Sequence, residues 1–258
     1  QILSLGQGMD GSRVQATQAI VKAIKNARKK PFLILNASAI GYYGPHRDEE
    51  LTEESPAGDD FLARTCQAWE AEARRAEGFG LRVVRLRIGI VLEKGGGALA
   101  KMLPPFQMGL GGPLGTGKQW MSWIHVRDVA GLVLHALENN AVMGTLNAVS
   151  PHPVTNREFT DTLAKELRRP AILPVPALAL KTLLGEMSSL LLDSQKVTSK
   201  RANTYKFLYP SLSLALREVC NDFNHELLTE QWVPAPVDKV FPFFSDSKNL
   251  EILTPDFL

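Results

Sequence analysis

Two side chains that could hold a substrate oxygen or transfer a proton lie close together in the segment NASAIGYYG, residues 36–44. The segment follows the apolar run PFLIL, which is typical of a fully buried strand. Open α/β sheets present their functional side chains where such strands end. We therefore predict Ser38 and Tyr43 as catalytic-site residues. The alternatives are a serine hydroxyl that is satisfied within the turn and a tyrosine that only packs.

The histidines and cysteines do not predict a metal site or a nucleophile. The five histidines show no spacing typical of metal ligands. Cys66 has no histidine or cation one helical turn away, which favours a buried structural thiol. Cys66 and Cys220 lie far apart in helical patterns, and no signal peptide opens the chain. We therefore expect two free thiols and a cytoplasmic protein.

The overall composition argues against two classes of partner. The 45% hydrophobic and 22% charged residues are ordinary for a globular protein. The net charge of +2 provides no strong field toward nucleic acid or an anionic membrane. The most apolar region, residues 170–193, contains Lys181, Glu186 and three prolines, so we do not expect it to cross a bilayer.

Helical and strand patterns alternate along most of the chain. The expected helices cover residues 12–29, 60–78, 127–139 and 157–169, with another from about 177. The expected strands cover residues 32–36, 81–92, 120–126, 144–149 and 172–176. This alternation predicts an α/β fold with a Rossmann-like doubly wound parallel sheet and a small C-terminal α/β lobe. The acidic stretch 44–60 between two of these elements is interpreted as a solvated loop.

Three helix caps are expected from the sequence. Asp59 or Asp60 would cap the helix over 60–78, and Asp128 would cap the helix over 127–139. Thr155 and Glu158 have the spacing of a capping box.

Both ends of the chain depart from this regular pattern. A nucleotide-binding sheet of this class holds the pyrophosphate at a glycine turn between its first strand and helix. No G-x-G-x-x-G or G-x-x-G-x-x-G lies in such a place near residue 1, so we expect the first βαβ segment to be missing. After residue 229 the chain changes to a proline-containing edge strand and a short amphipathic helix. The expected domains are residues 1–165, 166–228 and 229–258.

The strings SAIGYYG, DDFLARTCQAWEAEA, RIGIVLEKGGGALAKMLPPFQMGLGGPLGTGKQWMSWIHVRDVA and RPAILPVPALALKTLLGEM occur in this order. Together they resemble the atypical NAD-dependent epimerase/dehydratase-like proteins of the extended short-chain dehydrogenase/reductase superfamily, over roughly residues 1–220. The resemblance implies a Rossmann domain that binds NADP or NAD and a small-molecule substrate, and it leaves the substrate and the oligomeric state undefined. The tail from Gln231 resembles the opening of a START-like, polyketide-cyclase-type domain that binds hydrophobic ligands.

The resemblance also implies two sets of site residues. Those implied for the cofactor are Leu5 and Gly6 at a strand end, Arg13, Gly89, Ile90 and Val91. Those implied for the substrate are Arg87, Trp120, Trp123 and His125. Core packing of the aromatic residues and a surface position for Arg13 are the alternatives.

The superfamily performs proton transfer with a Tyr-x-x-x-Lys pair, in which the ammonium group one turn away favours the phenolate. The four tyrosines of this chain are followed at that spacing by His46, Arg47, Tyr209 and Ser213. If the helix over 60–78 takes the place of the motif, its two positions fall near Phe61 or Leu62 and near Cys66. Alignment on the YG pair places Ala39 at the position of the superfamily's serine. We interpret Leu62 and Cys66 as part of an apolar core stripe.

The sequence therefore predicts an NAD(P)-binding epimerase/dehydratase-like oxidoreductase that lacks the Tyr-x-x-x-Lys pair. One alternative is a catalytically silent nucleotide-binding scaffold or sensor. Another is a ligand-binding module that acts through the START-like tail.

Overall fold

The computed structural model describes residues 2–172, 174–176 and 192–220. The chain divides into two compact units, Gln1–Asn221 and Asp222–Leu258. The second unit lies outside the described residues, as does the helix expected from about 177. The description that follows is that of the first unit.

A parallel three-stranded sheet forms the centre of the first unit, in the order β1-β3-β7. Its strands are β1 (Leu33–Ala39), β3 (Arg82–Ile88) and β7 (Gly144–Ala148). Leu33 lies opposite Arg82 and Ala39 opposite Ile88, so the carboxyl ends of β1 and β3 are level. β1 and β3 thus pair in parallel, as in the predicted parallel sheet.

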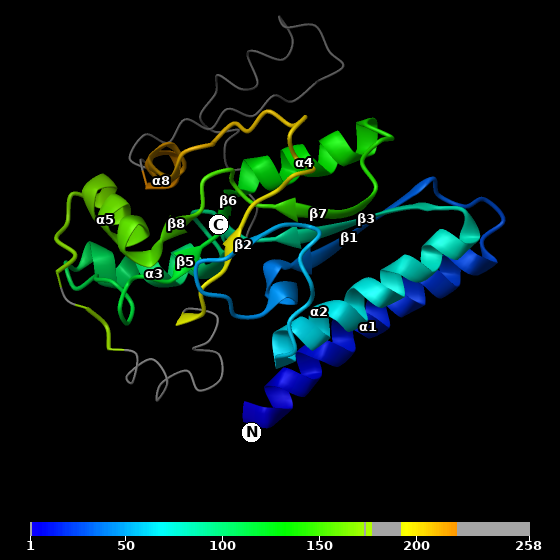
Figure 1. The fold of residues 1–258 in the computed structure, drawn as a ribbon, viewed down its shortest axis with the longest axis horizontal. Coiled ribbons are helices and arrows are strands. Elements are labelled where there is room, and N and C mark those ends of the chain that lie inside the picture. The colour runs from blue at the N-terminus through cyan, green and yellow to red at the C-terminus, as the bar shows by residue number, and fades with distance from the viewer. Residues whose placement is uncertain (1, 173, 177–191, 221–258) are drawn as a thin grey trace, which may run out of the picture. The chain divides into compact units, whose positions relative to one another are not determined.

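Helices cover both faces of this sheet (Figure 1). The helices are α1 (Ile2–Asn26) and α2 (Phe61–Arg74) on one face and α4 (Val126–Glu138) on the other. Val83 packs with Val21 of α1 and Ala73 of α2, whereas Val84 packs with Leu132 of α4. Neighbouring strand residues thus point to opposite helix layers, as the period of two in a strand requires. The predicted Rossmann-like α/β fold is confirmed.

A second apolar core lies beside the sheet. It joins α3 (Gly97–Gln107), α5 (Asn156–Leu167) and α8 (Leu212–Cys220). Phe159, Leu216 and Trp123 are fully buried in it. The boundary expected between residues 165 and 166 therefore falls inside α5, whose side chains pack against α8.

The remaining elements are short. Two 3₁₀ helices, η1 (Ile40–Tyr43) and η2 (Arg75–Phe79), follow β1 and α2. The short strands pair as β2 (Glu50–Leu51) with β9 (Lys196–Val197), β4 (Ile90–Leu92) with β6 (Trp123–His125), and β5 (Trp120–Met121) with β8 (Val154–Thr155).

The strand expected over 81–92 is divided at Gly89. β3 pairs with β7, whereas β4 leaves that sheet and pairs with β6. A Cβ atom at residue 89 would lie 2.5 Å from the Ser122 carbonyl oxygen, so the crossing requires a glycine. The strand expected over 172–176 is reduced to one bridge between Leu114 and Val175, because the prolines on either side of Val175 have no N–H to donate.

The strand end expected at Leu5 and Gly6 is wrong, because the backbone of both residues belongs to α1. A strand satisfies its N–H and C=O groups only through a neighbouring strand, whereas a helix satisfies them within its own segment. The central sheet places no partner strand beside these residues in the part of the chain that the structure describes.

Two of the three expected caps are confirmed. Asp60 caps α2 by accepting from the backbone N–H of Ala63. Thr155 and Glu158 form the capping box of α5. The cap expected at Asp128 is wrong, because the N-cap of α4 is His125, whose ring nitrogen accepts from the N–H of Arg127.

Asp128 is instead a buried attachment point for the segment 205–209. It is fully buried and accepts from the Tyr205 hydroxyl at 3.0 Å and from the N–H groups of Leu208 at 2.7 Å and Tyr209 at 2.9 Å. Gly131, one turn further along α4, has no side chain because the Tyr205 ring occupies that space.

The acidic stretch 44–60 is also less solvated than expected. The Glu53 carboxylate is partly buried and accepts from the backbone N–H of Asn147 and of Lys200, both at 3.0 Å. It therefore connects the loop after β2 to β7 and to the segment after β9, which are distant in the sequence.

Replacing Asp128 with alanine should strongly destabilise the fold. The change leaves two backbone N–H groups without their acceptor, and we expect a loss of about 3–5 kcal/mol in the free energy of unfolding. Urea denaturation measures the loss. Asp161→Ala, at an exposed position of α5, is the matched control and should cost under about 1 kcal/mol. Equal losses for the two variants would contradict this role of Asp128.

Tyr205 should make the protein sensitive to alkaline pH. Burial, followed by its hydrogen bond to Asp128, raises the pKa of Tyr205 from 10.0 to about 12. Its contribution is complete below pH 10 and is lost as the pH rises through about 12, because the unfolded chain releases the proton first. The free energy of unfolding should therefore fall less steeply over this range in Tyr205→Phe than in the parent. Identical pH profiles would contradict the prediction.

Candidate functional site

A cavity of about 240 Å³ opens at the carboxyl ends of β1 and β3. Its floor is formed by the residues that follow these two strands, namely Ala39, Ile40, Gly41, Ile88, Gly89 and Ile90. Open α/β sheets bind their ligands outside the carboxyl ends of the strands. The cavity therefore lies where the fold favours a binding site.

Helix α2 supplies one wall through Leu62 and Cys66. Cys66 is only 6% exposed, and burial raises the pKa of its thiol, so it is protonated at neutral pH. Ala39, Leu62 and Cys66 thus line one cavity, and Cys66 is at the same time a buried residue of the apolar stripe of α2.

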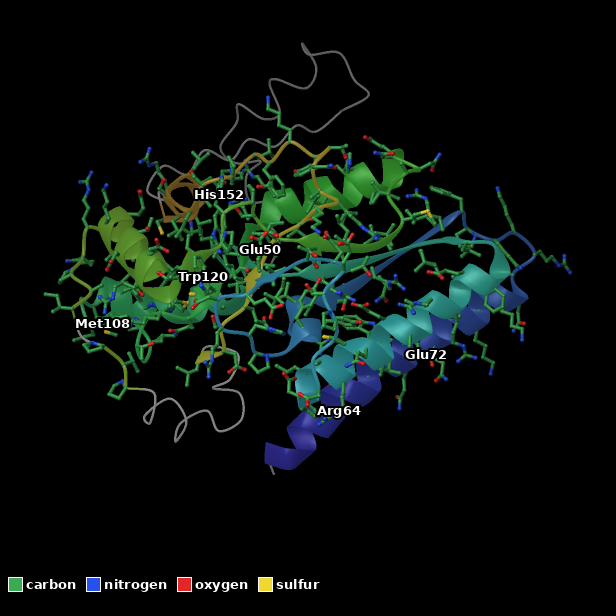
Figure 2. The ribbon with its side chains drawn as sticks, viewed as in Figure 1. Glu50, Arg64, Glu72, Met108, Trp120 and His152 are labelled. Atoms are coloured by element: carbon green, nitrogen blue, oxygen red, sulfur yellow. The ribbon has the colours of Figure 1, made fainter. Side chains whose placement is uncertain are left out.

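The opposite wall comes from α3, the loop before β5, and β5 itself. Its members are Met102, Leu114, Trp120 and Met121. Trp120 is held by its ring N–H, which donates to Asp48 at 2.9 Å, and it lies beside α3 and α5 in Figure 2. Ser122, Asp193 and Gln195 complete the lining.

A buried polar layer lies behind the cavity, between β1, β3 and α2. Glu70 is 2% exposed, and its carboxylate accepts from the Arg87 guanidinium through two bonds of 2.8 and 2.9 Å. The Ser38 hydroxyl donates to the same carboxylate at 2.7 Å. The guanidinium also stacks 3.2 Å from the ring centroid of Tyr42. Ser38 and Arg87 are neighbours in the β1–β3 register, which explains why one carboxylate reaches both.

Glu70 maintains the charge of Arg87 in this interior. Burial is the largest single influence and lowers the pKa of the guanidinium, but the hydrogen bonds and charge of Glu70 together with Tyr43 outweigh burial and raise the pKa above its ordinary value. Two buried charges cost several kcal/mol each to remove from water, and only good mutual geometry repays that cost. The bidentate contact provides such a geometry. The pair therefore determines where α2 sits on the sheet.

The predicted catalytic residues are placed behind the cavity. Ser38 is 4% exposed and Tyr43 is fully buried. The Tyr43 hydroxyl donates to the Asn147 side chain at 2.7 Å, and burial raises its pKa. Arg87, predicted as a substrate contact, is likewise occupied by Glu70. In the described structure these three residues hold elements together and do not line the cavity.

Two other residues predicted as substrate contacts, Trp123 and His125, are also buried. Trp123 is fully buried in the α3–α5–α8 core, and its ring N–H donates to the His152 carbonyl at 3.1 Å. His125 is 1% exposed, lies 2.8 Å from a carboxylate oxygen of Glu218, and stacks on Tyr209 with ring centroids 3.8 Å apart. It connects the start of α4 to α8.

Of the predicted cofactor residues, some line the cavity and others lie elsewhere. Gly89 and Ile90 line the cavity, as does Trp120 from the substrate set. Val91 packs in the core under α4, and Arg13 lies exposed on α1 with its guanidinium 5.5 Å from the Trp69 ring centroid. Three of the predicted site residues, Gly89, Ile90 and Trp120, thus lie together at the cavity, whereas Val91 and Arg13 lie elsewhere.

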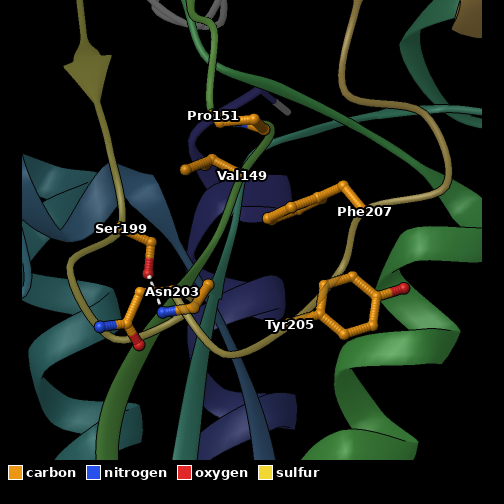
Figure 3. A pocket seen from close by; sticks show the side chains of 7 residues that line it. Val149, Pro151, Ser199, Asn203, Tyr205 and Phe207 are labelled. Atoms are coloured by element: carbon orange, nitrogen blue, oxygen red, sulfur yellow. Dashed lines mark hydrogen bonds between the residues drawn. The ribbon is translucent and has the colours of Figure 1, made fainter.

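A second cavity of about 230 Å³ lies beside the end of β7 (Figure 3). It is lined by Val149, Pro151, Ser199, Ala202, Asn203, Tyr205 and Phe207. The Tyr205 hydroxyl points away from it toward α4, where it donates to Asp128. The Ser199 hydroxyl oxygen accepts from the Ala202 N–H. Its polar groups thus stabilise the surrounding loop.

The described residues contain no group of three His, Cys, Asp or Glu side chains that could hold a metal ion. None of the described helices combines the length and the apolar character needed to cross a bilayer. Cys66 and Cys220 are both free thiols.

Comparison with known families gives two matches. The NAD dependent epimerase/dehydratase family matches residues 8–148, which is more than half of the chain. The chain belongs to this family. A domain of unknown function, DUF1731, matches residues 175–219 of this family member, in the region expected to form the C-terminal lobe.

Curated relatives of this epimerase family member come from plants, animals and bacteria. The epimerase family protein SDR39U1 homolog of Arabidopsis thaliana, described as chloroplastic, is 45% identical over 213 residues. That match covers 81% of this chain and 61% of the plant protein. Human epimerase family protein SDR39U1 is 43% identical over 213 residues, which cover 81% of this chain and 72% of the human protein.

Solved structures agree with this assignment. The crystal structure of human SDR39U1 with NADPH has a TM-score of 0.82 at 40% identity and covers 85% of this chain and 75% of that chain. A nucleoside-diphosphate sugar epimerase from Corynebacterium glutamicum has a TM-score of 0.68 at 28% identity, over 97% of this chain and 53% of its own. UDP-glucuronic acid 4-epimerase from Bacillus cereus, at 15% identity, shares the fold.

Removing one charge of the buried Glu70–Arg87 pair should lower the free energy of unfolding more than removing both charges. Glu70→Leu or Arg87→Met leaves one buried charge uncompensated, and we expect each to cost about 3–5 kcal/mol in the free energy of unfolding. The double variant removes both charges and should cost less than either single change. Chemical denaturation of the three variants gives the comparison.

The pair Glu72–Arg75, between the end of α2 and the start of η2, is the matched control. Its ionic groups are 3.0 Å apart, and the side chains of Arg75 and Glu72 are 61% and 19% exposed. Glu72→Leu and Arg75→Met should each cost under about 1 kcal/mol. A double variant at 70 and 87 that is as unstable as the sum of its single variants would contradict the analysis.

Proposed function

We propose that this family member binds NADP or NAD along the carboxyl edge of the sheet, with the nicotinamide end at the cavity beside Ala39, Leu62 and Cys66. The observation that carries the proposal is the cavity at the level carboxyl ends of β1 and β3. The resemblance to the superfamily would place its motif near Leu62 and Cys66, if the helix over 60–78 takes the usual position of the motif. The human relative whose structure was solved with NADPH supports it.

A bound nicotinamide supplies or accepts a hydride, and the chain's own residues provide the surroundings for that step. The apolar wall of Leu62 and Ile90 excludes water from the ring, which strengthens the electrostatic contacts formed there. Gly89 allows the backbone at the end of β3 to lie close to neighbouring groups. The function proposed is that of an epimerase/dehydratase-like oxidoreductase that acts on a small molecule.

The wall of α2 also favours a second candidate, a nucleotide-binding scaffold or sensor without turnover. Leu62 cannot exchange a proton, and the raised pKa of Cys66 keeps it from acting as a base at neutral pH. An active enzyme would therefore have to exchange its proton through a group other than the phenol and ammonium of the superfamily. Consumption of NADPH in the presence of substrate distinguishes the two candidates.

The proposal includes the domain organisation expected from the sequence. Residues 166–228 would form a small C-terminal lobe, and the tail from residue 229 would begin a START-like domain for hydrophobic ligands. The free thiols support a reducing compartment such as the cytoplasm.

Filling the cavity from α2 should weaken nicotinamide binding. We expect Leu62→Trp to lower the affinity for NADPH at least tenfold, because the indole occupies the space assigned to the ring. Reduced nicotinamide mononucleotide, which carries only the nicotinamide half, should lose affinity in parallel. Titration followed by the fluorescence of the reduced nicotinamide measures both.

Leu134→Trp is the control for this experiment, because Leu134 is 56% exposed on α4, on the other side of the sheet. It should leave both affinities unchanged. The proposal fails if the parent protein binds neither ligand, or if the two tryptophan variants behave alike.

A further inference from the structure

Arg85 is a buried cation whose hydrogen-bonding capacity is only partly used. It lies at the middle of β3, on the same face as Val83 and Arg87, and only 7% of it is exposed. Its Nη2 atom donates to the Thr145 hydroxyl at 3.2 Å. Its Nε and Nη1 atoms have no hydrogen-bond acceptor among the residues that the structure describes. Buried charged donors are costly to leave unpaired, so this guanidinium group is able to bind a further acceptor.

The carboxylate that approaches Arg85 is a loose partner. Glu77, on η2, has one oxygen 3.8 Å from Nη1 of Arg85, which is too long for a hydrogen bond, and its side chain is 47% exposed. The neighbouring Arg87, by contrast, is bound by Glu70 at 2.8 and 2.9 Å. The Glu77 side chain can therefore turn toward water at little cost and leave its place to another anion.

The guanidinium group of Arg201, after β9, lies beside that of Arg85. A Cβ atom at residue 144 would lie 3.0 Å from Nη1 of Arg201 and 3.8 Å from Nη2 of Arg85. Nη1 of Arg201 donates to two neutral acceptors, the backbone carbonyls of Met143 at 3.2 Å and Thr145 at 3.3 Å. Two cations therefore flank the start of β7.

Arg74, the last residue of α2, is the third cation at this place and is exposed. Burial, and then the charge of Arg74, lower the pKa of Arg85. The opposing influences of Glu70 and Glu77 are each smaller than that of Arg74. An anion bound between these cations would relieve their mutual repulsion. We call the guanidinium groups of Arg74, Arg85 and Arg201 the arginine cluster.

The carboxylates whose charges interact with Arg85 or Arg201 are Glu70, Glu77 and Glu54. Glu70 is bound by Arg87, as described above, and Glu54 lies 3.0 Å from the ammonium group of Lys200. Among these carboxylates, this leaves Glu77 to balance the arginine cluster. The region therefore carries an excess of positive charge.

We propose that the arginine cluster binds a phosphate group, which takes the place of the Glu77 carboxylate. Guanidinium groups bind phosphate through charge-assisted hydrogen bonds, and a phosphate brings up to two negative charges where Glu77 brings one. Nη1 of Arg85 would donate to a phosphate oxygen from the interior, and the exposed Arg74 and Arg201 would cover the phosphate from the solvent side.

This site lies apart from the cavity at the strand ends. Arg85 precedes Ile88, which lines that cavity, by three residues on β3, and Arg85 itself does not line it. The inference therefore goes beyond the proposed function and is independent of it.

The test is a titration of the full chain with inorganic phosphate at constant pH and ionic strength. Broadening of the phosphate ³¹P NMR signal detects binding, and isothermal titration calorimetry measures the affinity. We expect saturable binding in the presence of sodium chloride. Binding of glycerol 3-phosphate in the same way would extend the ligand class to phosphate monoesters, and binding of inorganic phosphate alone would restrict it to the free anion.

Removing the buried cation should remove the site. We expect Arg85→Met to lower the phosphate affinity by about tenfold or more, because hydrogen bonds to a charged group are lost. Arg157→Gln, at an exposed position of α5, removes the same charge elsewhere and is the matched control. It should bind phosphate as the parent does.

Two surface variants guard against misfolding of Arg85→Met. Arg201→Gln should weaken phosphate binding. Glu77→Gln should strengthen it by about two- to fivefold, because a neutral amide competes less well than a carboxylate for Arg85. Opposite changes in the two variants are not expected from a general loss of structure, and thermal melting confirms that each variant is folded.

The possible results separate this inference from the proposed function. Absence of saturable phosphate binding overturns the inference and leaves the proposed function untouched, because the cavity takes no part in the site. Equal affinities for the parent and a folded Arg85→Met also overturn it. If Arg85→Met does not fold, unchanged affinities in both Arg201→Gln and Glu77→Gln overturn it.

Discussion

The buried ion pair between Glu70 and Arg87 is the interaction on which the arrangement of the site depends. It joins the middle of α2 to the end of β3, and the Ser38 hydroxyl adds the end of β1 to the same carboxylate. Because charges in a protein interior are tolerated only when they are paired in good geometry, this contact permits little sliding of α2 along the sheet. Cys66 lies one helical turn before Glu70, so the wall of the cavity is positioned by the same contact.

The two faces of the sheet are built differently around this pair. Under α4 the side chains of β3 are apolar, as with Val84 and Leu86. Under α1 and α2 the alternate positions carry Arg85 and Arg87, and across the register β1 contributes Asn36 and Ser38. A polar layer can be buried there because α2 brings Glu70 to it. The apolar face stabilises the fold by burial, and the polar face specifies the position of α2.

A second set of buried contacts connects the residues after β9 to the central sheet and to α4. Asp128 holds the segment 205–209 against α4, and Glu53 ties the residues after β9 to β7. His125, between Glu218 and Tyr209, joins α4 to α8. From the sequence alone, each of these polar side chains could be interpreted as a surface residue or a catalytic residue. Their common role is to fix loops that make few regular hydrogen bonds of their own.

The sequence by itself determined the class of fold and the approximate place of the site. The periods of its apolar residues located β1, β3, β7 and the main helices, because a strand and a helix expose their faces with different local periods. Local rules also identified the caps at Asp60 and Thr155, since these bonds span only a few residues. Of the residues predicted for the site, Gly89, Ile90 and Trp120 line the cavity.

Only the tertiary structure decided which side of each strand end faces the cavity. Ser38 and Ala39 are adjacent in the chain, but a strand points them in opposite directions, and the position of α2 determines which one becomes buried. The same holds for Arg87 and Ile88 on β3. The partners of Asp128, His125 and Glu53 lie about 80 to 150 residues away, so no local pattern could reveal them. Long-range pairing of buried polar groups is therefore what turns the predicted fold into a particular site.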